Sequence, residues 1–242
     1  MRLKRKQGFY EKYIKRLLDI VCALSAIIIF WWLYLIIAMI VWVKMGSPVV
    51  FKQPRPGSID PRTGKERIFD MYKFRTMTDE RDENGELLPD EVRLGKFGKT
   101  LRATSLDELL EVVNILKGDM SVIGPRPFLI RDMVFMTDKQ RMRHTAKPGM
   151  SGLAQVMGRN AIAWEQKMDW DLKYIEKVSF LGDLKIIVMT VKKVFGHRES
   201  DKELSATLDF GDALLRDGKI SQAKYEALQA YARNILVVHN KK

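Results

Sequence analysis

Two adjacent carboxylates, Asp107 and Glu108, stand in the stretch LRATSLDELLEVV. A carboxylate can attack phosphorus only when the negative charge of both partners is neutralised, which calls for a magnesium ion and for cationic side chains. Such side chains occur just upstream at Arg102, in the later GPRP turn at Arg126 and in MYKFRTM at Lys73 and Arg75. The sequence therefore offers the groups that such an attack requires.

A purely structural interpretation of the same residues is also open. Leucine and valine recur at helical spacing after Ser105, and the pair Lys117-Gly118 predicts the end of that helix. Ser105 would then cap the helix, Glu108 would complete a capping box, and Asp107 would favour the helix dipole. The local pattern alone favours this cap, whereas the surrounding basic residues favour a phosphate site.

The segment from Ile20 to Val43 contains no charged residue. At about 1.5 Å per residue, a helix of this length can cross a hydrocarbon core about 30 Å thick. Basic residues flank it on both sides, so the positive-inside bias places both flanks in the cytoplasm, as in a re-entrant helix. The segment lacks Pro and Gly, and only Ser25 and the pair Trp31-Trp32 are available for a bend. A buried helix of a soluble protein is the alternative.

The charge balance points to anionic partners. Lys and Arg total 42 against 30 Asp and Glu, which gives a net charge of +12 and a pI of about 9.7. The single Cys22 excludes an intrachain disulfide. No Cys or His cluster has transition-metal spacing, and the aromatic interleaving that favours nucleic acid is missing, so nucleic acid is not an expected partner.

The rest of the chain contains short strand and helix signals. Strands are expected at 49–52 and 67–74, joined as a hairpin with a long loop, and helices at 164–175 and 180–195. The last of these has an apolar stripe with lysines away from it, which fits either a helix on an anionic membrane surface or a helix facing the core. After Gly196 the composition changes to a tail of two short helices. The expected division is 1–45, 46–196 and 197–242.

Two stretches resemble known ligand-binding motifs but lack a residue that each motif requires. The GKT at 98–100 resembles the end of a phosphate-binding loop, but Arg93 stands where that loop needs Gly. The acidic stretch at 80–91 approaches a calcium-loop spacing, but it begins with Glu and contains Pro89. Neither a nucleoside triphosphatase nor a calcium site is expected.

Four stretches together resemble the small bacterial polyprenyl-phosphate phosphoglycosyltransferases of the PglC type, a family of monotopic bacterial sugar transferases: QPRPG, YKFRTM, LGKFGKTLRATSLDELLEVVNILKGDMSVIGPRP and KPGMSGLAQVMGRNAIAWEQK. The resemblance runs from about Tyr13 to Phe195 and includes the membrane segment. It implies a helix-rich, compact α+β domain at the cytoplasmic face of the bacterial inner membrane. An N-terminal re-entrant membrane helix and amphipathic interfacial helices would accompany that domain.

The resemblance also implies a reaction. A UDP-sugar would donate its sugar 1-phosphate to polyprenyl (undecaprenyl) phosphate, with release of UMP. Asp107 would be the nucleophile at the β-phosphorus and would lie against Mg2+, and Glu108 would be its partner. The residues that would contact phosphate or the donor are Lys73, Arg102, Arg126 and Arg159. The basic Arg75 beside Lys73 is a further candidate from its residue type and position.

The sequence departs from the family pattern at two places. Trp31 and Trp32 stand where members of this size usually carry the Ser-Pro that turns the membrane helix back. Met157 replaces the Asn of AQVNGRN. The first departure bears on the re-entrant geometry, and the second on the choice of sugar.

The leading hypothesis is a membrane-resident enzyme that starts a glycan on a lipid carrier through a covalent aspartyl phosphosugar. The donor is expected to be of the N-acetylated hexosamine type. One alternative is a non-catalytic, membrane-anchored basic adaptor that binds anionic lipid or polymer. Another is a transferase in which the acceptor attacks the donor directly in a ternary complex, without a covalent enzyme intermediate.

Overall fold

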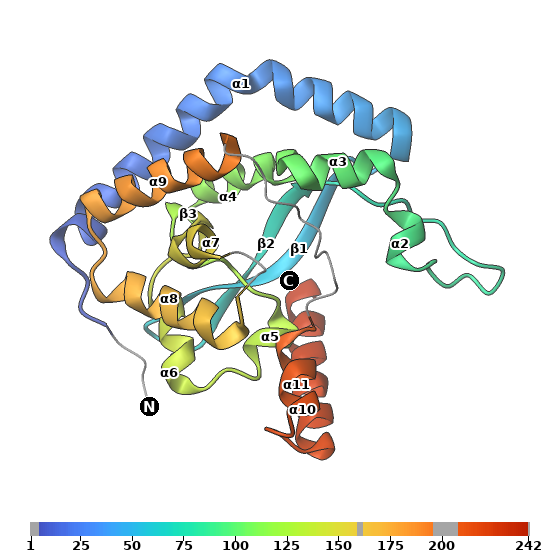
Figure 1. Cartoon of the computed structure of the whole chain (residues 1–242). Coiled ribbons are helices and arrows are strands. Elements are labelled where there is room, and N and C mark those ends of the chain that lie inside the picture. The colour runs from blue at the N-terminus through green and yellow to red at the C-terminus, as the bar shows by residue number, and fades with distance from the viewer. Residues whose placement is uncertain (1–4, 159–161, 196–207, 242) are drawn as a thin grey trace. The chain divides into compact units, whose positions relative to one another are not determined.

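The computed structural model describes residues 5–158, 162–195 and 208–241, which form two compact units (Figure 1). The first unit comprises Met1–Asp19, Pro54–Phe69 and Gly118–Lys242, and the second comprises Ile20–Gln53 and Asp70–Lys117. The chain passes from one unit to the other within three elements, which are α1 (Lys15–Met45), β1 (Val50–Ile59) and β2 (Glu66–Phe74).

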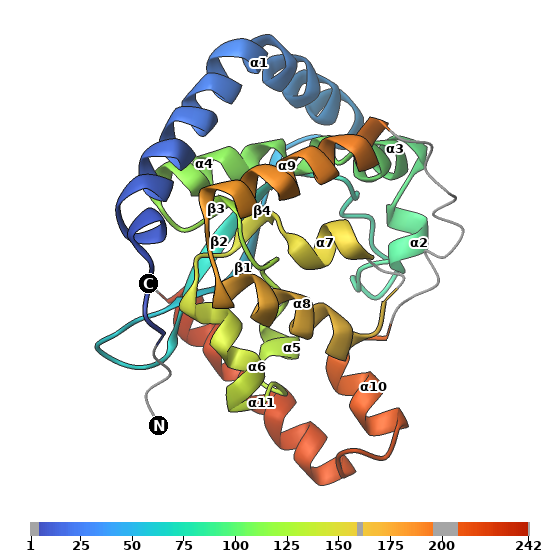
Figure 2. The same ribbon diagram turned by 60° about the vertical axis from the view of Figure 1, so that its left-hand side comes forward.

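A short π-helical turn, η1 (Tyr10–Ile14), leads directly into α1. Together they form a helical segment, Tyr10–Met45, that is long and apolar enough to cross a membrane. Only 11% of its most apolar stretch is buried, so the alternative of a core helix in a soluble protein is wrong. Both views show α1 as one helix that bends near its middle, although the apolar segment has neither Pro nor Gly (Figures 1 and 2).

The expected hairpin is present. β1 and β2 pair in a two-stranded sheet, and the backbone N–H of Asp60 donates to the carbonyl of Lys65 at 2.8 Å across their connection. Gly64 in this connection has φ of +70°, a conformation that favours glycine. The strand prediction is therefore confirmed, with longer strands than the apolar runs alone indicated.

The second unit contains α2 (Asp90–Arg93), α3 (Lys96–Thr104), η2 (Leu106–Leu110) and α4 (Glu111–Lys117). Its core joins the C-terminal half of α1 to β2 and α3, with Ile37, Val41, Phe74 and Leu101 all buried. Leucines of η2 pack against the same cluster. The apolar helix and the segment that carries the adjacent carboxylates thus share one hydrophobic core.

The first unit is built around a short parallel pair, β3 (Ser121–Ile123) and β4 (Gly149–Ser151), in the register Ser121 to Gly149. Three glycines let the two backbones touch, because a Cβ on Gly124, Gly149 or Gly152 would lie within 2.3 Å of a backbone atom. The helices of this unit are α5 (Ile130–Met133), α6 (Asp138–Arg141), η3 (Met142–Thr145), α7 (Leu153–Met157), α8 (Trp164–Glu176), α9 (Phe180–Phe195), α10 (Phe210–Arg216) and α11 (Gln222–Asn240).

The tail helices α10 and α11 pack on the body of the first unit. Phe210 is 2% exposed and belongs to a core cluster with Phe128 and Met168, while Ala232 of α11 is buried against Ile130. The two predicted tail helices are present, and α11 is a long helix. The division of the chain at 45 and 196 stays a prediction.

The amphipathic helix α9 exposes its apolar stripe. Leu181, Leu184, Val188 and Val191 are exposed, whereas Ile186 on another side of the helix is buried in the core. The sequence pattern left a core-facing stripe and a membrane-facing stripe open. The exposed side chains favour the membrane-facing interpretation.

Candidate active site

The segment that carries Asp107 begins at an unusual backbone residue. Ser105 has φ of +57° and ψ of +19°, and no other non-glycine residue in the described part of the chain has a positive φ. This left-handed residue separates α3 from the 3-10 turn η2, so the chain changes direction immediately before the carboxylates. Asp107 lies in the first turn of η2 and is 7% exposed.

The predicted capping box is wrong. The side chain of Ser105 makes no capping hydrogen bond, and the carboxylate of Glu108 accepts instead from Nζ of Lys73 at 2.7 Å. In a capping box the N-cap residue has an extended backbone, whereas Ser105 is left-handed. In addition, the carboxylate of Glu108, which would complete the capping box, pairs with Lys73. The predicted helix to Lys117 is otherwise confirmed, because η2 continues into α4.

Lys73 of β2 links two carboxylates. Its Nζ lies 2.7 Å from Oε1 of Glu108 and 3.6 Å from Oε1 of Glu111, which is 2% exposed. Asn114 holds β2 against α4, since its side chain accepts from the N–H of Tyr72 at 3.0 Å and donates to the carbonyl of Asp70 at 2.7 Å. These hydrogen bonds therefore hold Lys73 beside the helical segment η2–α4, which carries Glu108 and Glu111.

Glu111 and Asn114 were not singled out from the sequence, although a signal was present. Asp107, Glu111 and Asn114 stand at i, i+4 and i+7, so they fall along one side of the helical segment. All three are buried. A polar series at helical spacing inside an apolar helix indicates a buried polar network, and here Glu111 contacts Lys73 while Asn114 bonds the backbone of β2 beside it.

The environment of Asp107 works against its ionised form. Burial raises the pKa of Asp107, and the neighbouring Glu108 adds to that rise, while the charges of Lys73 and Arg102 oppose it. The net direction is upward. Added positive charge near Asp107 would favour its ionised form, whereas the negative charge of a nearby phosphate ligand would oppose it.

Arg102 lies one turn before Ser105 and is anchored on Thr76. Its Nε donates to Oγ1 of Thr76 at 3.0 Å, and no other hydrogen bond of its guanidinium occurs among the described residues. The close approach of α3 to this strand end depends on Gly98, because a Cβ there would lie 2.0 Å from the Thr76 carbonyl oxygen. The glycine of the rejected GKT motif thus has a packing role, and Arg102 keeps donors that can bind an anion.

Arg75 is placed differently from Lys73 and Arg102. Its three side-chain nitrogens are occupied by the carbonyl of Met77, the carbonyl of Ser47 and the carboxylate of Asp79, at 2.9, 3.2 and 2.8 Å. The side chain is buried and holds together the backbone around β2. Its predicted contact with substrate stays a prediction.

The remaining two predicted residues are not among the described residues of the second unit. Arg126 follows β3 in the first unit, where its carbonyl accepts from the buried Arg143, which also pairs with Asp171. The guanidinium of Arg143 lies 3.8 Å from the ring centroid of Phe128. Arg159 lies outside the described residues. The second unit therefore brings together Asp107, Glu108, Lys73 and Arg102.

Comparison with known proteins identifies the family. Residues 10–197 match the family model described as bacterial sugar transferase. The chain belongs to the bacterial sugar transferase family. The match covers η1 through α9 and stops before the tail helices.

Several curated relatives are similar to most of this chain. An uncharacterised sugar transferase, EpsL of Bacillus subtilis, is 50% identical over 187 residues, which are 75% of this chain and 87% of that protein. A UDP-glucose:undecaprenyl-phosphate glucose-1-phosphate transferase of Klebsiella pneumoniae is 37% identical over 191 residues, 75% of this chain and 40% of that protein. A UDP-N-acetylgalactosamine-undecaprenyl-phosphate N-acetylgalactosaminephosphotransferase of Aeromonas hydrophila is 35% identical over 198 residues, 77% of this chain and 45% of that protein. The match thus spans most of EpsL but less than half of the other two relatives.

Proposed function

We propose that this protein transfers a sugar 1-phosphate from a UDP-sugar to polyprenyl phosphate, through a covalent intermediate on Asp107, as the first membrane step of glycoconjugate biosynthesis. The observation that carries the proposal is that Asp107 is buried and that the positive charges of Lys73 and Arg102 act on it. The names of the relatives support the reaction class, since they act between sugar donors and undecaprenyl phosphate.

In the first step an oxygen of Asp107 forms a bond to the β-phosphorus of the donor, and the bond from that phosphorus to the UMP oxygen breaks. UMP leaves, and the sugar phosphate remains as an acyl phosphate. In the second step an oxygen of polyprenyl phosphate attacks the same phosphorus, and the carboxylate of Asp107 is released. Lys73 and Arg102 stabilise the charge on the phosphoryl oxygens in both steps.

Glu108 supports both steps without forming a bond to phosphorus. Its carboxylate accepts from Lys73, so it sets the position of that ammonium group. In the second step it also takes the proton from the lipid phosphate if that phosphate arrives protonated.

We propose that Mg2+ binds at Asp107 together with the donor. No group of three or more side chains able to hold a metal occurs among the described residues. Mg2+ usually binds through one or two carboxylates together with substrate phosphates and water, so Asp107 would hold the ion jointly with the donor diphosphate. The ion would neutralise part of the diphosphate charge.

We further propose that α1 is re-entrant and that both units lie on the cytoplasmic face. The N-terminal turn of α1 is fixed to the first unit, because Lys15 pairs with Asp183 and Asp19 accepts from Ser121. The C-terminal half of α1 is part of the core of the second unit. β1 and β2 each continue from one unit into the other, so a simple span that placed the two units on opposite faces would also have to carry these strands through the membrane. The bend of α1 and the basic residues on both flanks support the same topology.

A release assay tests the activity and the donor together. The full chain, in detergent with polyprenyl phosphate and Mg2+, is given a panel of UDP-sugars that includes glucose, galactose and N-acetylated hexosamines. UMP release with one or a few donors, and its loss in the Asp107→Asn variant, is the expected result. Salt-dependent lipid binding without release from any donor, and without an effect of Asp107→Asn, would support the basic adaptor instead.

A further inference from the structure

The ammonium group of Lys73 lies between two acids that differ in their exposure to solvent. Its hydrogen bond goes to Glu108 at 2.7 Å, whereas Oε1 of Glu111 lies 3.6 Å away, beyond hydrogen-bonding distance. The side chain of Glu108 is 19% exposed, and that of Glu111 is 2% exposed. Lys73 therefore has an outer partner that solvent reaches and an inner partner that the fold encloses.

The backbone holds this arrangement in place. Glu108 and Glu111 are three residues apart on the helical segment η2–α4, so their side chains lie on the same side of it. The two hydrogen bonds of Asn114 fix the backbone of Asp70 and Tyr72, directly before Lys73. The long, flexible side chain of Lys73 can still rotate. Its ammonium group can therefore change hydrogen-bond partner without a movement of the strand.

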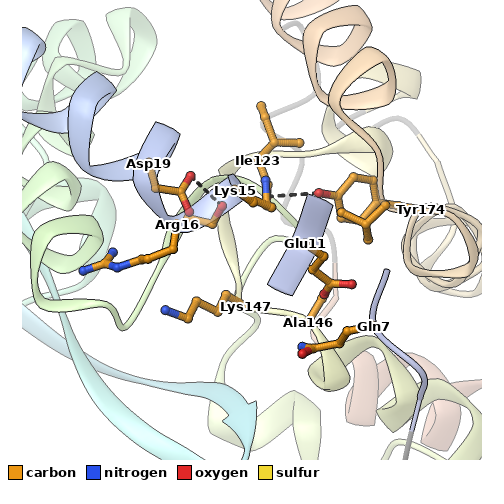
Figure 3. Close-up of a pocket in the computed structure, with 11 residues that line it drawn as sticks. Gln7, Glu11, Lys15, Arg16, Asp19, Ile123, Ala146, Lys147 and Tyr174 are labelled. Carbon is orange, nitrogen blue, oxygen red and sulfur yellow. Dashed lines mark hydrogen bonds between the residues drawn. The ribbon is translucent and has the colours of Figure 1, made fainter. Parts of the chain in front are cut away.

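The ion pair at the start of α1 is arranged differently. Lys15 lines a cavity of about 70 Å³ in the first unit (Figure 3) and pairs with Asp183. Both side chains are buried, and Asp183 also accepts from the hydroxyls of Tyr10 and Tyr174, each at 2.9 Å. Three donors thus hold one enclosed acid, which suits a structural pair. The partly exposed Glu108 is the acid that a ligand can replace.

The proposed reaction requires such a replacement. Lys73 is to stabilise phosphoryl oxygens, but its hydrogen bond in this structure goes to Glu108. A phosphate oxygen competes with a carboxylate for the donors of an ammonium group. When Lys73 turns from Glu108 to the donor, Glu111 can compensate for the lost bond. Their separation of 3.6 Å needs to shorten by about 0.8 Å to reach an ordinary charge-assisted hydrogen bond of about 2.8 Å.

We propose that Glu111 is a positioning residue, which keeps the ammonium group of Lys73 in the site while Lys73 exchanges Glu108 for a phosphate oxygen of the donor. This inference rests on the proposed function and deepens it. The exchange moves hydrogen bonds only, and no covalent bond forms or breaks in it. It also releases the carboxylate of Glu108, which can then accept the proton of a protonated lipid phosphate in the second step.

Two matched substitutions beside the same lysine test the proposal. Glu108→Gln and Glu111→Gln each remove one negative charge and keep the shape of the side chain. The probe is α,β-methylene-UDP with Mg2+, which carries both phosphates and cannot release UMP. Its binding to the full chain in detergent is measured by isothermal titration calorimetry.

The two variants should change the affinity in opposite directions. Glu111→Gln should bind the probe about tenfold more weakly than wild type, the effect of about one charge-assisted hydrogen bond. Glu108→Gln should bind it at least as tightly as wild type, because the probe no longer competes with a carboxylate for Lys73. If both acids acted only as negative charges near the diphosphate, both variants would bind the probe more tightly.

A third variant separates charge from packing. Glu111→Asp keeps the charge but removes a methylene group from a buried side chain, so it disturbs the packing more than Glu111→Gln does. It should nevertheless bind the probe more tightly than Glu111→Gln, and melting temperatures show whether each variant is folded.

Three results would overturn the proposal. They are equal or tighter binding by Glu111→Gln than by wild type, weaker binding by Glu108→Gln than by wild type, and weaker binding by Glu111→Asp than by Glu111→Gln. Failure of the proposed function has a different signature, which is a wild-type protein that releases no UMP from any UDP-sugar.

Discussion

Nζ of Lys73 lies 2.7 Å from Oε1 of Glu108, and the two side chains are 13% and 19% exposed. This ion pair joins a strand residue to the immediate neighbour of the proposed nucleophile. It takes the place of the capping box that the local sequence predicted. The role of Glu108 is therefore tied to Lys73 more closely than to the start of the helix.

The first prediction concerns this pair. Lys73→Gln and Glu108→Gln should each lower the turnover number by about a hundredfold or more, the usual effect of removing one stabilising group from a transition state. The double variant should lose less than the product of the two single losses, because Glu108 acts in part by positioning Lys73. The UMP-release rates of wild type, the two single variants and the double variant form a double-mutant cycle. Independent losses that multiply in the double variant would show that Glu108 acts separately from Lys73.

The second prediction concerns Gly98. In Gly98→Ala a new methyl group would meet the carbonyl of Thr76, so α3 should move and Arg102 should lose its anchor. The free energy of unfolding should fall by about 1–3 kcal/mol, and donor binding should weaken. Gly8→Ala is the matched control, because nothing lies within 4 Å of the corresponding position and its φ is not in the left-handed region. Similar melting temperatures for the two variants would contradict the packing role.

A pH prediction follows from a buried triad in the first unit. Nδ1 of His144 lies 3.0 Å from Glu66, and its Nε2 lies 3.3 Å from a guanidinium nitrogen of Arg143, so the neutral ring donates to one and accepts from the other. Burial lowers the pKa of His144, and the charge of Arg143 adds to that effect. Burial by itself would raise the pKa of Glu66, but hydrogen bonds from His144 and Arg141 lower it to about 2.

These shifts of the two pKa values determine how the stability of the fold changes with pH. His144 is neutral in the folded chain and gains a proton more readily when unfolded, so its contribution to stability is full above about pH 6.5 and falls at lower pH. The contribution of Glu66 is full above about pH 4.5 and is lost as the pH falls toward 2. The melting temperature should decrease from pH 7.5 to 5.5, and His144→Asn, which can keep the donor to Glu66, should reduce that slope. A slope unchanged by His144→Asn would refute the assignment to this residue.

The tail supplies the fourth prediction. Phe210 is 2% exposed in a cluster with Phe128, Phe135, Met136 and Met168, so Phe210→Ala should cost about 3–5 kcal/mol of unfolding free energy. Val237→Ala on α11 is the control, because Val237 is 50% exposed. Thermal unfolding of the full chain in detergent measures both. No difference between the two variants would mean that the tail is appended to the fold without supporting it.

The sequence predicted the elements better than it predicted their contacts. The hairpin, the helix to Lys117 and the helices α8 and α9 follow from local periodicity, which depends only on residues close in the chain. The left-handed Ser105 was missed because this conformation is rare for serine and leaves no local signature. The pairing of Lys73 with Glu108 was missed because it joins residues 35 positions apart. The packing of Phe210 was missed for the same reason, since the single phenylalanine of the tail gives no sign in the sequence of the residues that it contacts.

The central claim is that Asp107 carries the sugar phosphate during the reaction. The most direct measurement incubates the full chain with a donor labelled in its β-phosphate and Mg2+, without acceptor, and follows label on the protein. We predict that wild type becomes labelled on the peptide that contains Asp107, that polyprenyl phosphate removes the label, and that Asp107→Asn is neither labelled nor active. Turnover by a wild-type protein that never carries label, or normal UMP release by Asp107→Asn, would contradict the covalent mechanism.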